Sequence, residues 1–316
     1  MSQPTVRALV ACYNDWAPLA EGLASLAASR HPVTRASVLD NGSDDPAPAD
    51  FARGLSVPVD VERVTPNRGY AGGMNVLIAR ALADADAELL LLLNADARLE
   101  PDMLERLVAR LAADPQLGGL SPRILEAGTG RPWFVGGQLN VRKARAAHLQ
   151  EPRGPGLDLQ GEFVSGCVFL VRRCVLEQVR GFDERYFMYM EDADMCVRIR
   201  QAGWRLGVDG DALAHHAVSK GRSRSAASSD LKCYFITRNR VLFARRHLGG
   251  IAGLAYFGAF FALDLAREAW RDWRAGRRRE LRLRMAGVRD ALAGVTGAPS
   301  GARLAELQRI AGGANA

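Results

Sequence analysis

A run of five leucines, from Leu89 to Leu93, limits what this chain can fold into more than any other feature of its sequence. The run is too short to cross a bilayer, which needs about 20 apolar residues in a helix. A strand that is apolar on both faces must be covered on both faces, and such strands lie inside parallel sheets flanked by helices. The leucine run therefore predicts a central, buried strand in an α/β domain.

Strand and helix patterns alternate along the chain on the N-terminal side of this run. We expect strands at 6–13, 36–39 and 57–64, and helices at 19–29 and 73–83. Strands that alternate with helices form a mostly parallel central sheet, and ligands collect at the carboxyl ends of its strands.

Polar side chains occur where three of these strands end. They are Tyr13 and Asn14 after the first strand, Asp40 and Asn41 after the second, and Asn94 and Asp96 after the leucine run. This coincidence predicts a single site, in which Asp96 binds Mg²⁺ or Mn²⁺ together with a diphosphate. Taken alone, an Asn-x-Asp sequence after a strand is more typical of a turn or a helix cap.

A glycine-rich segment from Asn67 to Asn75 leads into the second helix. Backbone N–H groups at a helix N-terminus can approach a nucleotide sugar. The segment does not match the dinucleotide-binding pattern G-x-G-x-x-G. The alternative interpretation is a tight turn that needs positive φ at Gly69, Gly72 or Gly73.

Acidic residues gather at the start of a helix expected at 192–202, with Glu191, Asp192 and Asp194 close together. Acidic side chains in a first helical turn commonly serve only to cap the helix. Here the preceding segment 186–190 is aromatic and Met-rich, which would place the carboxylates beside a partly apolar pocket. A carboxylate in such a pocket can act as a general base.

Basic side chains follow farther along the chain. His215 and His216 come after a strand expected at 204–208 and precede a polar loop at 219–229. Paired histidines are often surface or core groups, and a neutral imidazole is also a common metal ligand. Arg238 lies on a helix expected at 230–248, where it would either clamp a phosphate or face solvent.

Residues 128–161 are rich in Gly and Pro and lack a clear period. This pattern predicts irregular loops with a β-excursion, and acceptor specificity often lies in such segments. A strand is expected next, at 163–171.

The C-terminal region is basic. From Arg238 to the end it holds 15 Arg against 6 Asp and Glu, a balance of +9 in a chain whose net charge is +7. The apolar stretch 251–263 is too short to span a bilayer, so we expect an interfacial helix with Tyr256, Trp270 and Trp273 near lipid headgroups. The alternative is a helix packed on its own domain or on a second subunit. No nucleic-acid-binding motif accompanies the charge.

The five cysteines are scattered, without a close Cys or His partner, which indicates a reducing compartment and no structural zinc. The first residues lack the pattern of a signal peptide. We therefore expect a cytoplasmic protein, peripheral on the inner face of the cell membrane.

Taken in order, these motifs resemble family 2 of the glycosyltransferases, in its rhamnosyltransferase-like branch. The resemblance runs from about residue 6 to residue 240, and the motifs that carry it are Ala11–Asn14, Leu39–Asp45, Asn67–Asn75, Leu92–Asp96, Gly181–Glu184, Glu191–Asp194 with Arg198, Gly203-Trp204 and His215-His216. It implies a GT-A glycosyltransferase domain over residues 1–240 and a helical C-terminal extension, basic and apolar, over 241–316.

The resemblance also implies roles for the residues named above. Asp192, with Glu191 beside it, would be catalytic, and Asp96 with His216, or with His215 instead, would hold the metal. The donor-binding residues would be Tyr13, Asn14, Asp40, Asn41, Asn67, Gly69, Gly73, Asn75, Asn94 and Arg238. The family's usual Asp-x-Asp appears here as Asn94-x-Asp96, which offers one carboxylate fewer to a metal.

The activity implied is inverting transfer of a sugar from a dTDP- or UDP-sugar to a hydroxyl of a glycan or lipid-linked acceptor in cell-surface polysaccharide synthesis. dTDP-rhamnose is the first donor expected, ahead of galactofuranose, glucose and N-acetylglucosamine donors, and a homodimer is compatible with it. The two alternatives are a non-catalytic nucleotide-sugar binding or scaffold protein and a sugar-phosphate nucleotidyltransferase. The second should open with a glycine-rich basic loop after the first strand, which Ala11–Asp15 does not provide.

Overall fold

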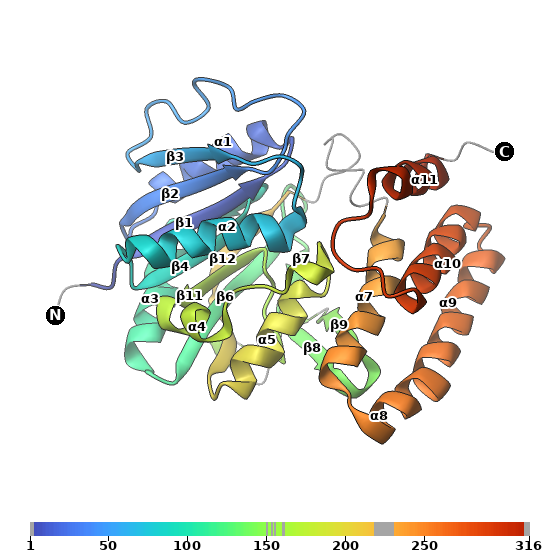
Figure 1. Ribbon diagram of the computed structural model, residues 1–316. Coiled ribbons are helices and arrows are strands. Elements are labelled where there is room, and N and C mark those ends of the chain that lie inside the picture. The colour runs from blue at the N-terminus through green and yellow to red at the C-terminus, as the bar shows by residue number, and fades with distance from the viewer. Residues whose placement is uncertain are drawn as a thin grey trace. The chain divides into compact units, whose positions relative to one another are not determined.

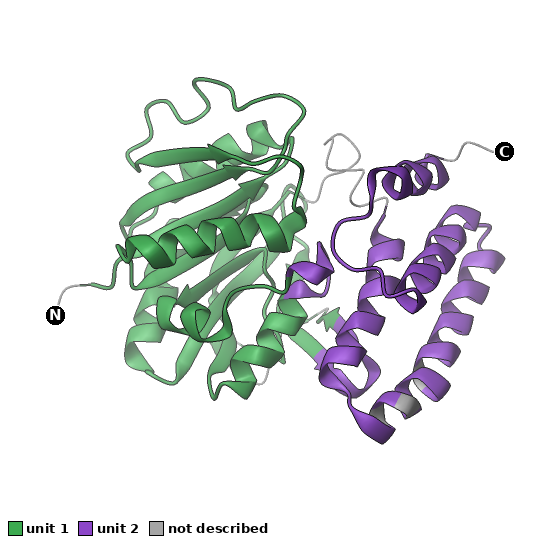
Figure 2. Ribbon diagram, viewed as in Figure 1, with its two compact units in different colours: residues 1–138, 147–183, 192–223 green, residues 139–146, 184–191, 224–316 purple. Residues whose placement is uncertain are grey.

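The computed structural model describes residues 3–149, 151–152, 154, 156–159, 162–217 and 231–312 (Figure 1). The chain divides into two compact units (Figure 2). Unit 1 comprises 1–138, 147–183 and 192–223, and unit 2 comprises 139–146, 184–191 and 224–316. The boundary predicted at residue 240 falls inside helix α7 (Lys232–His247). All of this helix belongs to unit 2.

A ten-stranded mixed sheet forms the centre of unit 1, in the order β10-β12-β6-β11-β4-β1-β2-β3, with β5 beside β12 and β7 beside β6. The strands are β1 (Val6–Cys12), β2 (Val33–Asp40), β3 (Val59–Arg63), β4 (Leu89–Asn94), β5 (Ala97–Leu99), β6 (Leu117–Glu126), β7 (Pro132–Phe134), β10 (Leu157–Asp158), β11 (Val168–Arg172) and β12 (Arg205–His216). Strands β3, β2, β1 and β4 are parallel, as are β6 and β12, whereas β11 runs antiparallel between β4 and β6.

The leucine run forms β4, as the sequence predicts. It lies between β1 and β11, and each of its five leucines is at most 1% exposed. Their burial stabilises unit 1 at about 25 cal/mol for each Å² of apolar surface removed from water.

Helices cover the sheet of unit 1. They are α1 (Trp16–Ala27), α2 (Gly69–Asp84), α3 (Met103–Ala113), α4 (Arg173–Val179) and α5 (Glu191–Gln201), whose first residue is assigned to unit 2. Helix α3 is amphipathic and buries Met103, Leu104, Leu107, Val108 and Leu111. Helix α2 begins earlier than predicted, because the glycine-rich segment itself forms its first turn. Gly69 has a φ of +70°, so the turn expected there is confirmed at this glycine.

Strand β12 is longer than predicted. The sequence indicated a strand only at 204–208 with the two histidines after it, but the strand continues through His216. Its register against β6 shifts between Asp209 and Leu213, an irregularity that masked the period-2 pattern. His215 and His216 are therefore strand residues, paired with Arg98 and Ala97 of β5.

The irregular segment at 128–161 contains the β-excursion that was expected. Strands β8 (Gly137–Asn140) and β9 (Arg145–His148) pair as a separate two-stranded sheet, with a short 3₁₀ turn η1 (Val141–Lys143) between them. The strand predicted at 163–171 begins only at Val168, and Phe163 contributes a single bridge to Gly137.

Unit 2 is helical in its C-terminal part. It contains α7, α8 (Gly250–Ala255), a π-helical segment η3 (Tyr256–Phe261), α9 (Ala262–Arg274), α10 (Arg278–Leu292) and α11 (Gly301–Ala311), and the 3₁₀ turn η2 (Glu184–Tyr186) comes from an earlier part of the chain. Its core gathers Leu231, Tyr234, Phe235, Leu283, Leu307 and Ala311. Within the described ranges, no helix has the length and apolar character needed to cross a membrane.

One prediction for this region is wrong. Tyr256 was expected near lipid headgroups, but its side chain is fully buried, packed on Phe261 with 5.8 Å between ring centroids. Burial raises its pKa to about 12. Trp270 and Trp273, in contrast, are 57% and 64% exposed.

Candidate active site

A carboxylate and an imidazole meet at the carboxyl end of β4. Oδ1 of Asp96 lies 3.1 Å from Nε2 of His216, which is the last residue of β12. The two strands come from distant parts of the sequence, and β5 joins them by pairing with β12 directly after Asp96. Nδ1 of His216 is buried and has no hydrogen-bond partner among the described residues. An imidazole with such an orphaned nitrogen is suited to a ligand.

The neighbouring histidine serves a different contact. Successive residues of a strand point to opposite faces, and Nε2 of His215 lies 2.8 Å from Oε1 of Glu100. Of the two alternatives left open by the sequence, the geometry favours His216 as the partner of Asp96.

Two residues that the sequence did not single out, Trp133 and His148, lie beside this pair. The ring of Trp133 stands 4.3 Å from the ring of His216 and 4.8 Å from the ring of His148, centroid to centroid. Nδ1 of His148 lies 3.0 Å from the carbonyl oxygen of Trp133 and must carry the hydrogen, because a carbonyl only accepts. Both residues lie in the segment of poor periodicity, where the only signal for a functional role was that they are a Trp and a His.

Asp192 lies in the first turn of α5. Its Oδ1 accepts a hydrogen bond from the backbone N–H of Ala193 at 2.8 Å, and its Oδ2 accepts one from Gly166 at 3.4 Å. Burial raises the pKa of this carboxyl, while the two hydrogen bonds and the charge of His148 oppose the rise. A carboxylate with a raised pKa is a stronger base than an exposed one.

The backbone beside β4 connects the two carboxylates. The N–H of Asn94 donates to the carbonyl oxygen of Cys167 at 2.9 Å, and the adjacent Gly166 is the residue that donates to Asp192. Burial, followed by the charge of Asp96, raises the pKa of Cys167. The hydroxyl of Tyr70, on α2, donates to the carbonyl oxygen of Gly166 at 2.6 Å and holds this turn in place. Asp96 and Asp192 are thus both close to the segment 166–167.

The loops after β1 and β2 are joined by side chains. Asn14 adopts φ +61° and exchanges hydrogen bonds with Asp44, while its N–H donates to Ser43. Asp40 is 2% exposed, accepts from the N–H of Ser43 and pairs with Arg63 at 3.0 Å. Tyr13, next to Asn14 in the chain, is half-buried.

Asn41 connects the same edge to the glycine-rich segment. Its Nδ2 donates to the carbonyl oxygen of Gly69 at 2.9 Å and to Oδ1 of Asn67 at 3.3 Å, and its Oδ1 accepts from the N–H of Arg68. A Cβ on Gly73 would stand 2.8 Å from Nδ2 of Asn41, so only glycine leaves this amide in place. The predicted residues Asn41, Asn67, Gly69 and Gly73 therefore form one local structure.

Asn75 holds α2 to the segment 181–183, which follows α4 in the chain. Its Oδ1 accepts from the N–H of Phe182 at 2.8 Å, and its Nδ2 donates to the carbonyl oxygen of the same residue at 2.9 Å. These bonds give Asn75 a structural role in addition to the sugar-side role that the resemblance implies.

Arg238 and Glu191 belong to unit 2. The guanidinium of Arg238 is 1% exposed and donates to the carbonyl oxygens of Tyr186 and Gly297 and to Oδ1 of Asn239. Because these contacts occupy the group, we leave Arg238 out of the donor site; its burial could not be inferred from the sequence. Glu191 is 8% exposed, and its charge contributes to raising the pKa of Tyr189 to about 12, after burial.

A further residue missed by the sequence analysis, Asn239, supports the segment before Asp192. Its Nδ2 lies 3.0, 2.8 and 2.8 Å from the carbonyl oxygens of Tyr186, Met188 and Tyr189. In this segment Phe187, Tyr189 and Met190 all have positive φ, between 65° and 72°. Non-glycine residues in this conformation are strained and need such support.

The donor set at Asp96 and His216 fits a divalent cation held largely by its substrate. No group of three or more His, Cys, Asp or Glu side chains suited to a metal occurs in the described part of the chain. Mg²⁺ and related cations are commonly held by one or two protein ligands, with phosphate oxygens and water completing the shell. Oδ1 of Asp96 and Nε2 of His216 lie 3.1 Å apart, close enough for one cation to contact both atoms.

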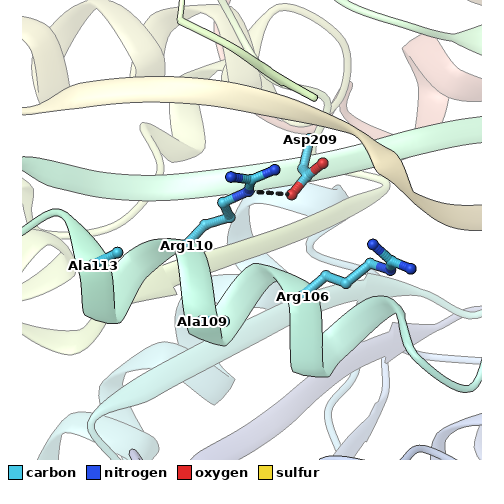
Figure 3. A pocket seen from close by; sticks show the side chains of 5 residues that line it. All are labelled: Arg106, Ala109, Arg110, Ala113 and Asp209. Carbon is cyan, nitrogen blue, oxygen red and sulfur yellow. Dashed lines mark hydrogen bonds and ion pairs between the residues drawn. The ribbon is translucent and has the colours of Figure 1, made fainter. Parts of the chain in front are cut away.

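A shallow pocket elsewhere on unit 1 contains none of these residues. It is lined by Arg106, Ala109, Arg110, Ala113 and Asp209, and Nε of Arg110 donates to Asp209 at 3.0 Å (Figure 3). Arg110 pairs with Asp209, and Arg106 pairs with Asp102 at 2.7 Å, so neither arginine of the pocket offers an unpaired charge to a ligand.

Comparison with known proteins extends this description. A model of the family described as "Glycosyltransferase like family 2" matches residues 4–244. An N-acetylglucosaminyl-diphospho-decaprenol L-rhamnosyltransferase of Mycobacterium tuberculosis is 31% identical over 239 residues, which cover 66% of this chain and 76% of that protein.

Two solved structures share the fold. A mannosyltransferase of Pyrobaculum calidifontis in complex with GDP-Man and Mn²⁺ has a TM-score of 0.57 at 20% identity and covers 99% of this chain and 81% of its own. Residues 1–349 of TarS of S. aureus, in complex with UDP-GlcNAc, have a TM-score of 0.59 at 17% identity and cover 96% of this chain and 83% of that one.

Proposed function

Since this chain belongs to glycosyltransferase family 2, we propose that it moves rhamnose from dTDP-rhamnose onto a hydroxyl of a glycan or lipid-linked acceptor. The chain is a glycosyltransferase with a GT-A fold, and inversion is typical of its family. Donor, acceptor and pathway are the parts that we propose.

The choice of donor and acceptor is supported by one relative. The name of the mycobacterial protein specifies an L-rhamnosyl group and an acceptor sugar carried on a polyprenyl diphosphate. We propose the same chemical classes here, with cell-surface polysaccharide as the product. Galactofuranose, glucose and N-acetylglucosamine donors are the next to test.

The observation that carries the proposal is the pair formed by Asp96 and His216, with Asp192 bound to Gly166 in the adjacent segment 166–167. All of these residues belong to unit 1. Inverting sugar transfer requires two groups: one that stabilises the negative charge of the leaving diphosphate, and a general base for the acceptor hydroxyl.

We propose that the Asp192 carboxylate takes the proton from the acceptor hydroxyl. The hydroxyl oxygen then forms a bond to the anomeric carbon from the face opposite the nucleotide, and the bond from that carbon to the diphosphate oxygen breaks. The electron pair leaves with the nucleoside diphosphate, so the configuration inverts. Asp192 suits this step because burial strengthens it as a base, and the N–H groups of Gly166 and Ala193 fix its orientation.

Asp96 and His216 would hold Mg²⁺ or Mn²⁺, and a cation there would neutralise charge on the departing diphosphate as a Lewis acid. Tyr13, Asn14, Asp40 and Asn41 would bind the nucleoside, and Asn67, Gly69, Gly73, Asn75 and Asn94 would line the diphosphate and sugar side.

We assign His148 a positioning role toward Asp192. Its imidazole is held by the carbonyl of Trp133 and contacts Phe134 and Phe163 at 5.0 and 6.0 Å between centroids. Its charge lowers the pKa of Asp192 against the effect of burial. This opposition keeps the base ionised over a wider pH range.

The organisation follows from these assignments. We propose that the transfer chemistry resides in the domain predicted over 1–240 and that the helical extension over 241–316 brings the enzyme to the inner face of the cytoplasmic membrane, where a lipid-linked acceptor is held. A homodimer is compatible with the proposal and is not required by it.

The test is incubation of the purified protein with dTDP-rhamnose or UDP-sugars, Mn²⁺ and an N-acetylglucosaminyl-diphospho-lipid analogue, with release of nucleoside diphosphate as the measurement. We expect release to depend on both the acceptor and Asp192. Tight binding of the nucleotide sugar, with no release for any donor and acceptor tried, would favour a binding or scaffold protein instead.

A further inference from the structure

Helix α9 turns its acidic side chains inward. Asp264, Glu268 and Asp272 are spaced four residues apart, so they lie along one face of the helix. Asp264 and Asp272 are 8% and 2% exposed, and the side chain of Glu268 is 20% exposed. Carboxylates are among the side chains least often buried, so their placement here needs partners.

Arginines of unit 2 provide those partners. Oδ2 of Asp264 lies 3.0 Å from Nη2 of Arg240 and 3.0 Å from Nε of Arg145. Asp272 pairs with Arg284 at 3.0 Å and with Arg277 at 2.8 Å. Glu268 contacts three of the same arginines, Arg145, Arg240 and Arg284. The negative charge of the helix is therefore neutralised inside unit 2.

The outward face of α9 carries the opposite composition. Leu263, Trp270 and Trp273 are 56%, 57% and 64% exposed. Arg267, Arg271 and Arg274 are exposed beside them, and the guanidinium of Arg274 lies 4.7 Å from the ring of Trp270. The acidic side chains of this helix lie toward the other face, and among those described only Asp264 approaches an outward arginine, Arg267, at 3.9 Å. The outward face therefore combines large apolar groups with net positive charge.

We propose that this face of α9 (Leu263, Arg267, Trp270, Arg271, Trp273 and Arg274) docks on an anionic lipid surface. Tryptophan favours the boundary between headgroups and acyl chains, and helices that lie in this boundary present arginine beside Trp and Leu. Arginine can bury its stem while its guanidinium stays at the phosphates. The inference deepens the proposed function, because it names the surface that would bring the enzyme to a lipid-linked acceptor.

A second copy of this chain fits the face less well than lipid does. Two such faces would bring arginines against arginines, and the carboxylates that could compensate are already paired inward. An acidic protein would complement the charge but gives no reason for the exposure of Leu263, Trp270 and Trp273. Lipid accounts for both properties at once.

The first experiment measures sedimentation of the full-length protein with neutral phosphatidylcholine vesicles and with vesicles containing half phosphatidylglycerol. We expect clear preference for the anionic vesicles. The triple variant Arg267→Gln, Arg271→Gln, Arg274→Gln should lose roughly a hundredfold in affinity, at roughly fivefold for each arginine. The control Arg30→Gln, Arg53→Gln, Arg180→Gln removes the same charge from exposed arginines of unit 1 and should stay within about twofold of wild type.

The second experiment locates the contact by tryptophan fluorescence with lipids brominated along the acyl chains. Wild type should be quenched, whereas Trp270→Phe, Trp273→Phe should bind but lose the quenching, since Trp16, Trp133 and Trp204 lie in unit 1. Three results would overturn the proposal: equal binding of wild type to both kinds of vesicle, equal losses of affinity in the two triple variants, or undiminished quenching in the Trp270→Phe, Trp273→Phe variant. A change of oligomeric state in the α9 triple variant would assign the face to a second copy instead.

Transfer to a water-soluble acceptor separates this proposal from the proposed function. The α9 variants should keep the wild-type rate with such an acceptor. If the wild-type protein transfers sugar but does not bind vesicles, only the docking surface is refuted. If it binds vesicles but transfers sugar from no donor, only the assigned activity is refuted.

Discussion

His216 and Asp96 lie 3.1 Å apart between Nε2 and Oδ1, while the adjacent His215 pairs with Glu100 through the other face of the same strand. The two histidines are thus a matched pair for mutagenesis. His216→Ala should weaken Mn²⁺-dependent binding of a nucleoside diphosphate by at least about tenfold. His215→Ala should leave it nearly unchanged. Calorimetric titration with and without Mn²⁺ measures both, and equal effects would contradict the assignment of His216.

Asp192 is assigned to the proton transfer and not to donor binding. Asp192→Asn keeps the size of the side chain and removes the base, so kcat should fall by about 10²- to 10⁴-fold. The Kd for the nucleotide sugar should change little. Single-turnover rates and calorimetry separate the two quantities, and wild-type turnover by the variant would refute the role.

The same substitution should stabilise the protein at neutral and alkaline pH. Burial raises the pKa of Asp192, so the native state binds its proton more tightly than the unfolded state. The carboxyl is therefore tolerated best at low pH, and its ionisation costs stability as the pH rises through the raised pKa. Asparagine has no such cost. The difference in Tm, variant minus wild type, should be near zero at low pH and grow to about a few degrees above the raised pKa.

His148 should affect the pH profile of the reaction. Its charge lowers the pKa of Asp192, so His148→Gln should raise that pKa further. Because only ionised Asp192 accepts a proton, the acid limb of the kcat profile should move to higher pH. His247→Gln, on α7 of unit 2, serves as the control and should leave the limb in place. An unmoved limb in His148→Gln would leave His148 with a packing role only.

Asn239 should matter to both stability and turnover. Asn239→Ala leaves the carbonyl oxygens of Tyr186, Met188 and Tyr189 without this donor, in a segment with three residues at positive φ. The expected loss is about 2–4 kcal/mol of unfolding free energy, measured with urea. kcat should fall as well, since this segment leads directly into Asp192, whereas an equal loss from a core truncation such as Leu283→Ala should spare kcat per folded molecule.

The order of strands and helices could be predicted from the sequence. The predictions were wrong where a polar or aromatic side chain that is usually exposed is buried. The leucine run became β4 because five apolar residues with nothing polar between them have few other uses in a domain of this size. Arg238 and Tyr256 look like exposed, functional side chains on paper. Both are fully buried. The carbonyl oxygens of Tyr186 and Gly297, from distant parts of the chain, accept hydrogen bonds from Arg238, whereas the ring of Tyr256 packs on Phe261 of the same helical segment.

The candidate site shows the same division. Polar residues directly after strands, such as Asp96 and Asn41, could be found because the end of a parallel strand marks the site by itself. Trp133 and His148 could not, since they lie in short strands, β7 and β9, whose patterns are too brief to establish a register. The end of β12 was missed for a related reason: the irregularity between Asp209 and Leu213 breaks the alternation that would have connected His216 to the strand.

The peptide bond between Glu191 and Asp192 is where the chain passes from unit 2 to unit 1, and the residues that Asn239 holds are the ones just before it. Anyone who builds chimaeras in order to exchange acceptor preferences between related enzymes must respect this arrangement. A single junction near residue 224 would combine a foreign C-terminal region with the native segment 184–191. The carbonyl oxygens of this segment would then face the foreign counterpart of α7, the helix that carries Asn239. Segments 139–146, 184–191 and 224–316 have to be transplanted together, as one cassette, if the hybrid is to keep its base in register.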